Sequence, residues 1–101
     1  MTVYVDNMKM KVQFFRWNGV WSNLYADTTD ELVDFAELLH LSPACMIDGS
    51  YTTERYMLTD RKRDEAIRLG ARPIRYGGTS MAAIFRRKLG SPNGEWRAKE
   101  L

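Results

Sequence analysis

An alternating pattern that runs into an Asn-Gly pair constrains the fold of this chain more than any other feature. Apolar and polar residues alternate over residues 8–14, which is the period of a strand with one buried face. Asn18 and Gly19 follow, and both tolerate the positive φ that a two-residue hairpin turn requires. Residues 20–25 are expected to form the return strand. The pattern therefore predicts a β-hairpin with its turn at Asn18-Gly19, whose aromatic residues pack across the two strands.

Strands and helices alternate along the rest of the chain. A short buried strand is expected over residues 2–5, and further strands over residues 44–47 and 72–76, the last at a sheet edge because of its proline. Helices are expected after the capping box of Thr28 and Glu31, after Thr59 and after Thr79-Ser80. Such an order favours an α/β fold, a mixed sheet in a two-layer or three-layer domain with an N-terminal hairpin and three helices.

Length and composition indicate one domain. The chain has 101 residues, of which 45% are hydrophobic, and no linker-like stretch divides it. We expect a single domain over residues 1–90 and a polar C-terminal tail over residues 91–101. No run of about 18 apolar residues is present, and Asp6 interrupts the region where a signal peptide needs apolar continuity. The expected location is cytoplasmic, without a membrane partner.

Charge is distributed unevenly although the net charge is only +2. Residues 1–50 carry three cations and seven anions, whereas residues 51–101 carry twelve cations and six anions. This asymmetry fits a basic face for phosphate or nucleic acid, and equally an attraction between the two halves or between two copies in a homodimer. The single cysteine, Cys45, lies in an apolar run and is expected to be a buried thiol. It has no ligand set for zinc around it, so no metal or cofactor is predicted.

Several blocks of the sequence resemble a family of small bacterial and phage proteins known as a domain of unknown function. Val3–Asn7 matches four of the five residues of the family's Val-Tyr-Val-Asp-Asp block. Residues 21–24 resemble its Trp-Ser-His-Leu block, and Ala26–Thr28 and Glu31-Leu32 resemble the residues that follow. Residues 55–57 resemble its His-Tyr-Asp block, and residues 66–71 the helix end behind it.

Three positions depart from that family pattern. Asn23 and Arg55 stand where the resemblance implies histidines, and Met57 stands where it implies an aspartate. A cluster of His and Asp at strand ends is able to polarise water or hold a metal. Because only Asp6 remains as an acid, the resemblance implies a member that has lost or changed any such activity.

The candidate site is a polar cluster at the ends of the predicted strands, since the crevice there is where a mainly parallel sheet binds its ligands. Arg55 is suited to a phosphate or carboxylate, and Asp6 to a ribose hydroxyl or to an ion pair with Arg55. The structural alternative, with Asp6 capping a turn and Arg55 solvated, stays open. The predicted ligand-binding residues are Asp6, Asn7, Ser22, Asn23, Arg55 and Tyr56.

Three hypotheses on function stay open, of which the first and third use this cluster and the second uses the hairpin aromatics, the acidic helix face or Trp96. The first is a small binding protein for a phosphate-bearing ligand such as a nucleotide, with no catalytic residue. The second is a phage-encoded module that acts on a host protein, and the third is a metal-dependent hydrolase using Asp6. Gly77–Ser80 is a weak anion cradle. The arginines of the second half are a weak candidate for a nonspecific nucleic-acid patch. His40 is expected to cap its helix or to form a salt bridge rather than to catalyse.

Overall fold

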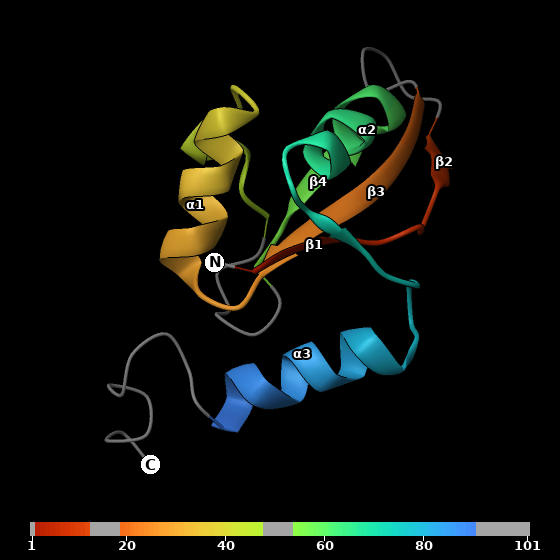
Figure 1. Ribbon diagram of the computed structural model, residues 1–101. Coiled ribbons are helices and arrows are strands. Elements are labelled where there is room, and N and C mark those ends of the chain that lie inside the picture. The colour runs from red at the N-terminus through yellow and green to blue at the C-terminus, as the bar shows by residue number, and fades with distance from the viewer. Residues whose placement is uncertain (1, 13–18, 48–53, 91–101) are drawn as a thin grey trace.

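The computed structural model describes residues 2–12, 19–47 and 54–90. In these residues a mixed five-stranded sheet and three helices confirm the α/β fold (Figure 1). The tail expected over residues 91–101 lies outside the described residues. None of the helices in the described residues is long and apolar enough to span a membrane. In chain order the elements are β1 (Val3–Val5), β2 (Met10–Val12), β3 (Gly19–Ala26), α1 (Thr29–Leu38), a 3₁₀ helix (Pro43–Cys45), β4 (Tyr56–Thr59), α2 (Asp60–Arg68), β5 (Arg72–Pro73) and α3 (Thr79–Gly90).

The longest strand, β3, is the centre of the sheet. It pairs antiparallel with β4 along one side, and with β2 and then β1 along the other. β1 also pairs in parallel with β5, which ends the strand order. β1 is therefore internal, and its three side chains are all buried, as the composition of residues 2–5 predicts. β5 is an edge strand, as its proline predicts, although it is shorter than the expected 72–76.

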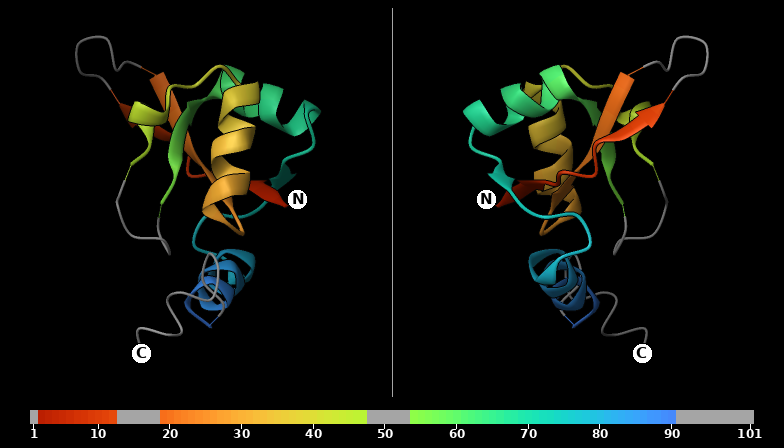
Figure 2. Two further views of the ribbon diagram at one scale, coloured as in Figure 1. Left: turned by 90° about the vertical axis from the view of Figure 1, so that its left-hand side faces the viewer. Right: turned by 90° about the vertical axis from the view of Figure 1, so that its right-hand side faces the viewer.

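Helices cover both faces of the sheet, so the domain has three layers (Figure 2). Cross-strand partners share a face, and the pair Val5 and Leu24 belongs to the main core with Leu32 and Phe35 of α1. α1 and α2 lie on this side in Figure 1, whereas α3 lies below the sheet. Tyr25, on the opposite face of β3, meets Phe85 of α3 edge to face at 5.6 Å between ring centroids.

The starts of the first two helices agree with their capping signals. Thr28 Oγ1 accepts a hydrogen bond from Glu31 N at 3.1 Å and donates to Glu31 Oε1 at 2.9 Å. The other carboxylate oxygen of Glu31 accepts from Thr2 N at 2.6 Å, so the capping residue also ties α1 to the start of β1. Thr59 Oγ1 accepts from Lys62 N at 3.3 Å and caps α2.

The predicted turn of the hairpin is wrong, although its two strands do pair. Val12 lies opposite Gly19 and Lys11 opposite Val20, whereas a two-residue turn at Asn18-Gly19 requires Val20 to lie opposite Trp17. Gly19 is a paired strand residue at φ 143°, a conformation suited to glycine. The register is fixed from the other end of β2, where Lys9 N donates to Ser22 Oγ and Asp6 accepts from Asn23 N, and a local turn signal does not override it. Residues 13–18, with the rest of the expected strand, lie outside the described residues.

The prediction for residues 44–47 is also wrong. Residues 43–45 form a 3₁₀ helix, and only Ile47 makes a bridge, to Arg55. Cys45 is exposed rather than buried. The strand that pairs with β3 in this part of the chain is β4, over residues for which no strand was predicted. Apolar composition alone does not separate a buried strand from a turn that leaves its side chains at the surface.

Candidate functional site

Asp6 is the buried centre of the polar cluster, at the break between β1 and β2. Its side chain is 0% exposed. One carboxylate oxygen accepts from Met8 N at 3.0 Å and from Asn23 N at 2.9 Å, and the other accepts from Asn23 Nδ2 at 2.8 Å. These three bonds compensate the cost of burying the charge. The carboxylate thus holds the chain where it leaves one strand and enters the next.

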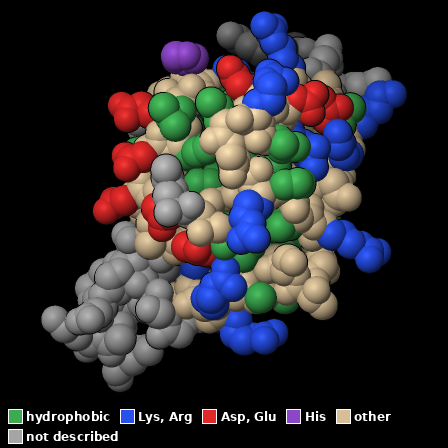
Figure 3. Space-filling view, in the orientation of Figure 1, with side chains coloured by type: hydrophobic (Ala, Val, Ile, Leu, Met, Phe, Trp, Pro, Cys, Tyr) green, Lys and Arg blue, Asp and Glu red, His purple; other side chains and the backbone are tan. Residues whose placement is uncertain are grey.

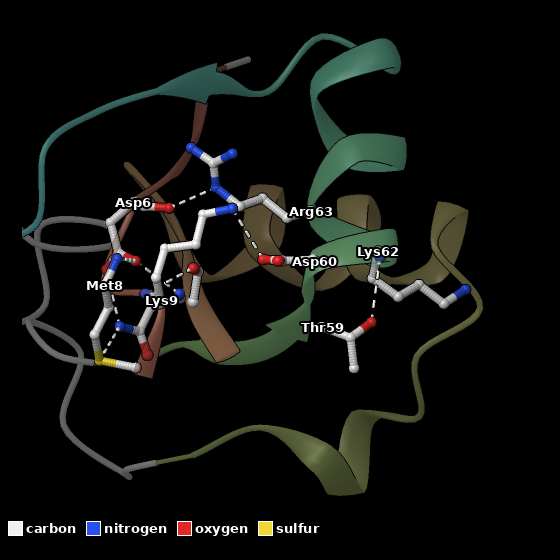
Figure 4. A network of polar contacts seen from close by, with 9 residues as sticks. Asp6, Met8, Lys9, Thr59, Asp60, Lys62 and Arg63 are labelled. Carbon is white, nitrogen blue, oxygen red and sulfur yellow. Dashed lines mark hydrogen bonds and ion pairs between the residues drawn. The ribbon is translucent and has the colours of Figure 1, made fainter. Parts of the chain in front are cut away.

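The same break is tied to α2 by two cations (Figure 4). Arg63 Nε donates to the backbone carbonyl of Asp6 at 2.7 Å. Lys9, a non-glycine residue at φ 51°, reaches Asp60 with its ammonium at 3.0 Å. Its backbone N–H donates to Ser22 Oγ at 3.2 Å. The strained backbone at Lys9 is therefore fixed from β3 and from α2 together.

A cavity of about 440 Å³ opens beside Asp6, between α3 and the sheet face that carries Asn23 and Tyr25. We call it the methionine pocket. Asn23 forms part of its wall and donates from Nδ2 to Met8 Sδ at 3.4 Å as well as to Asp6. Its volume falls in the range of small-molecule sites. The lining residues are Met8, Met10, Asn23, Tyr25, Arg55, Met57, Tyr76, Met81 and Phe85.

Charge in the methionine pocket is concentrated at one residue. Among the described residues that line it, Arg55 is the only charged one. Burial raises the pKa of the Tyr25 hydroxyl, the Asp6 carboxylate raises it further, and Arg55 partly offsets both. Tyr25 therefore remains protonated at neutral pH. The pocket offers a guanidinium, two phenols and an amide within an otherwise apolar wall.

The structure brings together only part of the predicted cluster. Asn23 and Arg55 line the methionine pocket and Asp6 is bonded to Asn23. Asn7 is exposed, and its Oδ1 accepts from Tyr76 N at 2.8 Å, which fastens the segment before α3.

Ser22 and Tyr56 point to the other face of the sheet, because Ser22 pairs with Leu58 and Tyr56 with Leu24 of the main core. The Tyr56 hydroxyl is buried there, with no hydrogen-bond partner among the described residues. Burial raises the pKa of this hydroxyl, and the nearby Cys45 and Glu54 add to the effect.

Most of the pocket wall was not among the predicted site residues. Met8 and Met10 are apolar positions of the alternating pattern over residues 8–14, and Met81 and Phe85 lie in the helix expected after Thr79-Ser80. Those predictions place the residues in a strand and in a helix, but they do not predict a cavity between the two elements. The one available signal was that Met57 follows Arg55 by two residues, so both point to the same side of a strand.

The residues described contain no group of three His, Cys, Asp or Glu side chains placed to hold a metal ion. Asp6 already uses both oxygens in hydrogen bonds to protein donors. This arrangement gives the carboxylate a structural task and leaves it little capacity for a further ligand.

The fold and the site define a small three-layer α/β domain with a pocket between its sheet and its last helix. The chain belongs to the family described as a protein of unknown function (DUF4031), whose profile matches residues 3–88. Searches of the curated proteins and of the solved structures each found no match. Asn23, Arg55 and Met57, the positions at which the resemblance implies His, His and Asp, all line the methionine pocket.

Proposed function

We propose that this protein binds a small phosphate-bearing ligand, such as a nucleotide, in the methionine pocket. The observation that carries the proposal is the placement of the Arg55 guanidinium in a wall that is otherwise uncharged among the described residues. A guanidinium recognises a phosphate or carboxylate by paired hydrogen bonds. Such a bond is stronger where apolar walls exclude water.

The rest of the wall supports a ligand with a planar or apolar body. Methionine side chains adapt to irregular shapes and make favourable contacts with aromatic rings. Tyr25, Tyr76 and Phe85 add aromatic surface, and Asn23 adds an amide whose oxygen is able to accept. A nucleotide offers a base to the apolar wall and a phosphate to Arg55, so it matches both parts of the pocket.

Direct titration with nucleoside monophosphates tests this proposal. We expect the parent protein to bind at least one of them, and Arg55→Gln to weaken that binding about tenfold, as expected for one charge-assisted hydrogen bond. Arg86→Gln is the matched control, because Arg86 is an exposed arginine of α3 outside the pocket wall. Binding that is equal in the parent and in Arg55→Gln contradicts the proposal, as does the absence of binding to the parent.

A protein-interaction module is the second candidate, and one observation favours it. Met10 is 52% exposed and Tyr76 is 50% exposed at the edge of the pocket, which gives this opening an apolar rim of the kind that binds partner side chains. Action on a host protein, a hydrolase activity using Asp6 and a cytoplasmic location remain predictions from the sequence. The second candidate is distinguished from the first if this protein binds a peptide and if added nucleotide competes with the peptide for the pocket.

A further inference from the structure

A second cavity, of about 590 Å³, lies between the edge strand β5 and α3. We call it the arginine cleft. Ser80, Ala83, Ile84 and Arg87 form its helical wall, and their spacing of three and four residues is that of one helix face. The methionine pocket is instead bordered by Met81 and Phe85, so α3 separates the two cavities. Tyr4 and residues 72–74 complete the lining of the cleft.

The strand wall supplies Arg72, whose guanidinium has no hydrogen-bond or ion-pair partner in the part of the chain that the structure describes. Arg72 lies opposite Tyr4 in the parallel pairing of β5 with β1, which directs it to the α3 face of the sheet. Its side chain is exposed, and among the described residues it makes neither an ion pair nor a hydrogen bond. An arginine at the edge of a cavity with all five of its donors available is suited to an anion.

The helical wall supplies a second guanidinium. Arg87 Nη2 donates to the Tyr4 hydroxyl at 3.0 Å and lies 3.2 Å from Asp27 Oδ1. The Tyr4 hydroxyl in turn donates to Asp27 at 3.1 Å. This network holds Arg87 against the sheet through one of its two terminal nitrogens, Nη2. The other nitrogens of the guanidinium group remain as donors for a ligand.

Charge balance in the arginine cleft favours an anion. Among the described residues that line it, two are arginines and none is a carboxylate. Asp27 compensates part of the Arg87 charge from outside that lining. Figure 3 shows acidic side chains along α1 and basic side chains over the part of the face that carries β5 and α3, while both kinds lie together at the top of the view, over α2.

We propose that the arginine cleft is a second binding site, for a phosphate group held by the guanidinium groups of Arg72 and Arg87. Ser80, on the same wall, adds a hydroxyl donor. The site is separate from the methionine pocket and does not depend on a ligand there. The phosphate belongs either to a small molecule or to a nucleic-acid backbone, since both present the same oxygens.

Calorimetric titration of the full chain with inorganic pyrophosphate at low ionic strength tests the site. We expect Arg72→Gln to weaken binding about tenfold, and Arg72→Lys to restore part of it because the charge returns without the paired donors. Arg86→Gln removes the same charge from the same molecule outside the cleft lining, and it should change the affinity less than about twofold. Arg72 is the decisive position, because its replacement breaks no side-chain hydrogen bond or ion pair among the described residues.

Two further arms identify the source of the phosphate and the independence of the site. The first arm uses a labelled single-stranded oligonucleotide. The phosphate is assigned to nucleic acid if the oligonucleotide binds more tightly than pyrophosphate and if Arg72→Gln reduces the slope of log binding constant against log salt concentration by about 0.7. Pyrophosphate binding without oligonucleotide binding assigns it to a small molecule. Because Arg55 also offers a cation to phosphate in the methionine pocket, the comparison is repeated with Arg55→Gln as the starting protein, and there Arg72→Gln should still weaken pyrophosphate binding about tenfold. Equal losses in Arg72→Gln and Arg86→Gln, or no binding of either probe by the parent, would overturn the proposal.

Discussion

At the scale of single residues, Asp6 explains why a polar residue follows a fully buried strand. Its carboxylate is the acceptor for two backbone amides that the strand ladders leave free, those of Met8 and Asn23. The Asn23 side chain donates to the second oxygen. An acid in this place looks like a catalytic group in the sequence, but its bonds show a structural role that positions the pocket wall.

Replacement of Asp6 by alanine measures that role. We expect Asp6→Ala to lower the free energy of unfolding by about 3 kcal/mol or more, because three donors lose their acceptor and two of them are backbone groups. Asp64→Ala is the control, since Asp64 is an exposed acid of α2 with no partner among the described residues, and its effect should stay within about 0.5 kcal/mol. Urea denaturation compares the two variants. Equal stability of both would show that the buried bonds of Asp6 contribute nothing net.

At the scale of elements, α1 and α2 end in the same way with different residues. Leu41 N donates to Ala36 O at 2.9 Å after α1, and Ala71 N donates to Ala66 O at 2.9 Å after α2. This 6→1 bond is the signature of a Schellman cap, which needs one residue of positive φ between the helix and the donor. Lys62 Nζ, from α2, adds a bond to the last turn of α1 at Leu39 O, 2.7 Å away.

The two caps differ in how well their residues suit positive φ. α2 has Gly70 there at φ 112°, whereas α1 has His40 at φ 60°. We expect His40→Gly to raise the free energy of unfolding by about 1 kcal/mol, because glycine adopts this conformation without the steric cost of a Cβ atom. The reciprocal change, Gly70→Ala, should lower it by a similar amount. Chemical denaturation gives both values, and a loss of stability in His40→Gly would contradict the cap assignment.

At the scale of the whole molecule, α3 makes fewer contacts with the sheet than α1 and α2 make, among the residues that the structure describes. The Tyr25 and Phe85 rings pack together, and Arg87 bonds to Tyr4 and Asp27. Cavities lie on both sides of the helix, where the sheet face is not filled by side chains. The arrangement that leaves these two cavities therefore makes the position of α3 depend on the buried side chains of Met81 and Ile84 and on a few aromatic and polar contacts.

Alkaline pH should weaken the packing of α3 on the sheet, because two buried tyrosines, Tyr4 and Tyr25, lie on the sheet face beneath this helix. Burial, and the charge of Asp27, raise the pKa of Tyr4; burial, and the charge of Asp6, raise that of Tyr25. A pKa above the ordinary value of 10.0 means that the folded state favours the protonated phenol, so this stability is complete below pH 10.0 and is lost as pH rises further.

Denaturation midpoints measured from neutral to alkaline pH check this expectation. The Tyr4→Phe, Tyr25→Phe double variant should lose less stability at alkaline pH than the parent does, because it lacks the two phenols that ionise more readily once the protein unfolds. Tyr76→Phe is the control, since Tyr76 is exposed. The same alkaline slope in the double variant and in the parent would mean that the loss comes from other groups.

Local signals in the sequence determined the starts of α1 and α2, the apolar stripe of α1 and the internal position of β1. A capping box, a 3.6-residue period and a run of β-branched residues each act through neighbours a few residues away. Asp6 and Asn23 were also recognised as members of one polar cluster, Asp6 because it follows the first predicted strand and Asn23 because it stands where the family resemblance implies a histidine.

Only the tertiary structure decided the strand register, the face on which each polar residue lies and the two cavities. Gly19 pairs with Val12 instead of forming a turn, and Tyr56 faces the core although its neighbour Arg55 faces the pocket. Each outcome depends on long-range packing that no short segment encodes. The cavities depend on how far α3 stands from the sheet, and that distance is set by contacts such as Tyr4 with Arg87, which lie 83 residues apart in the sequence.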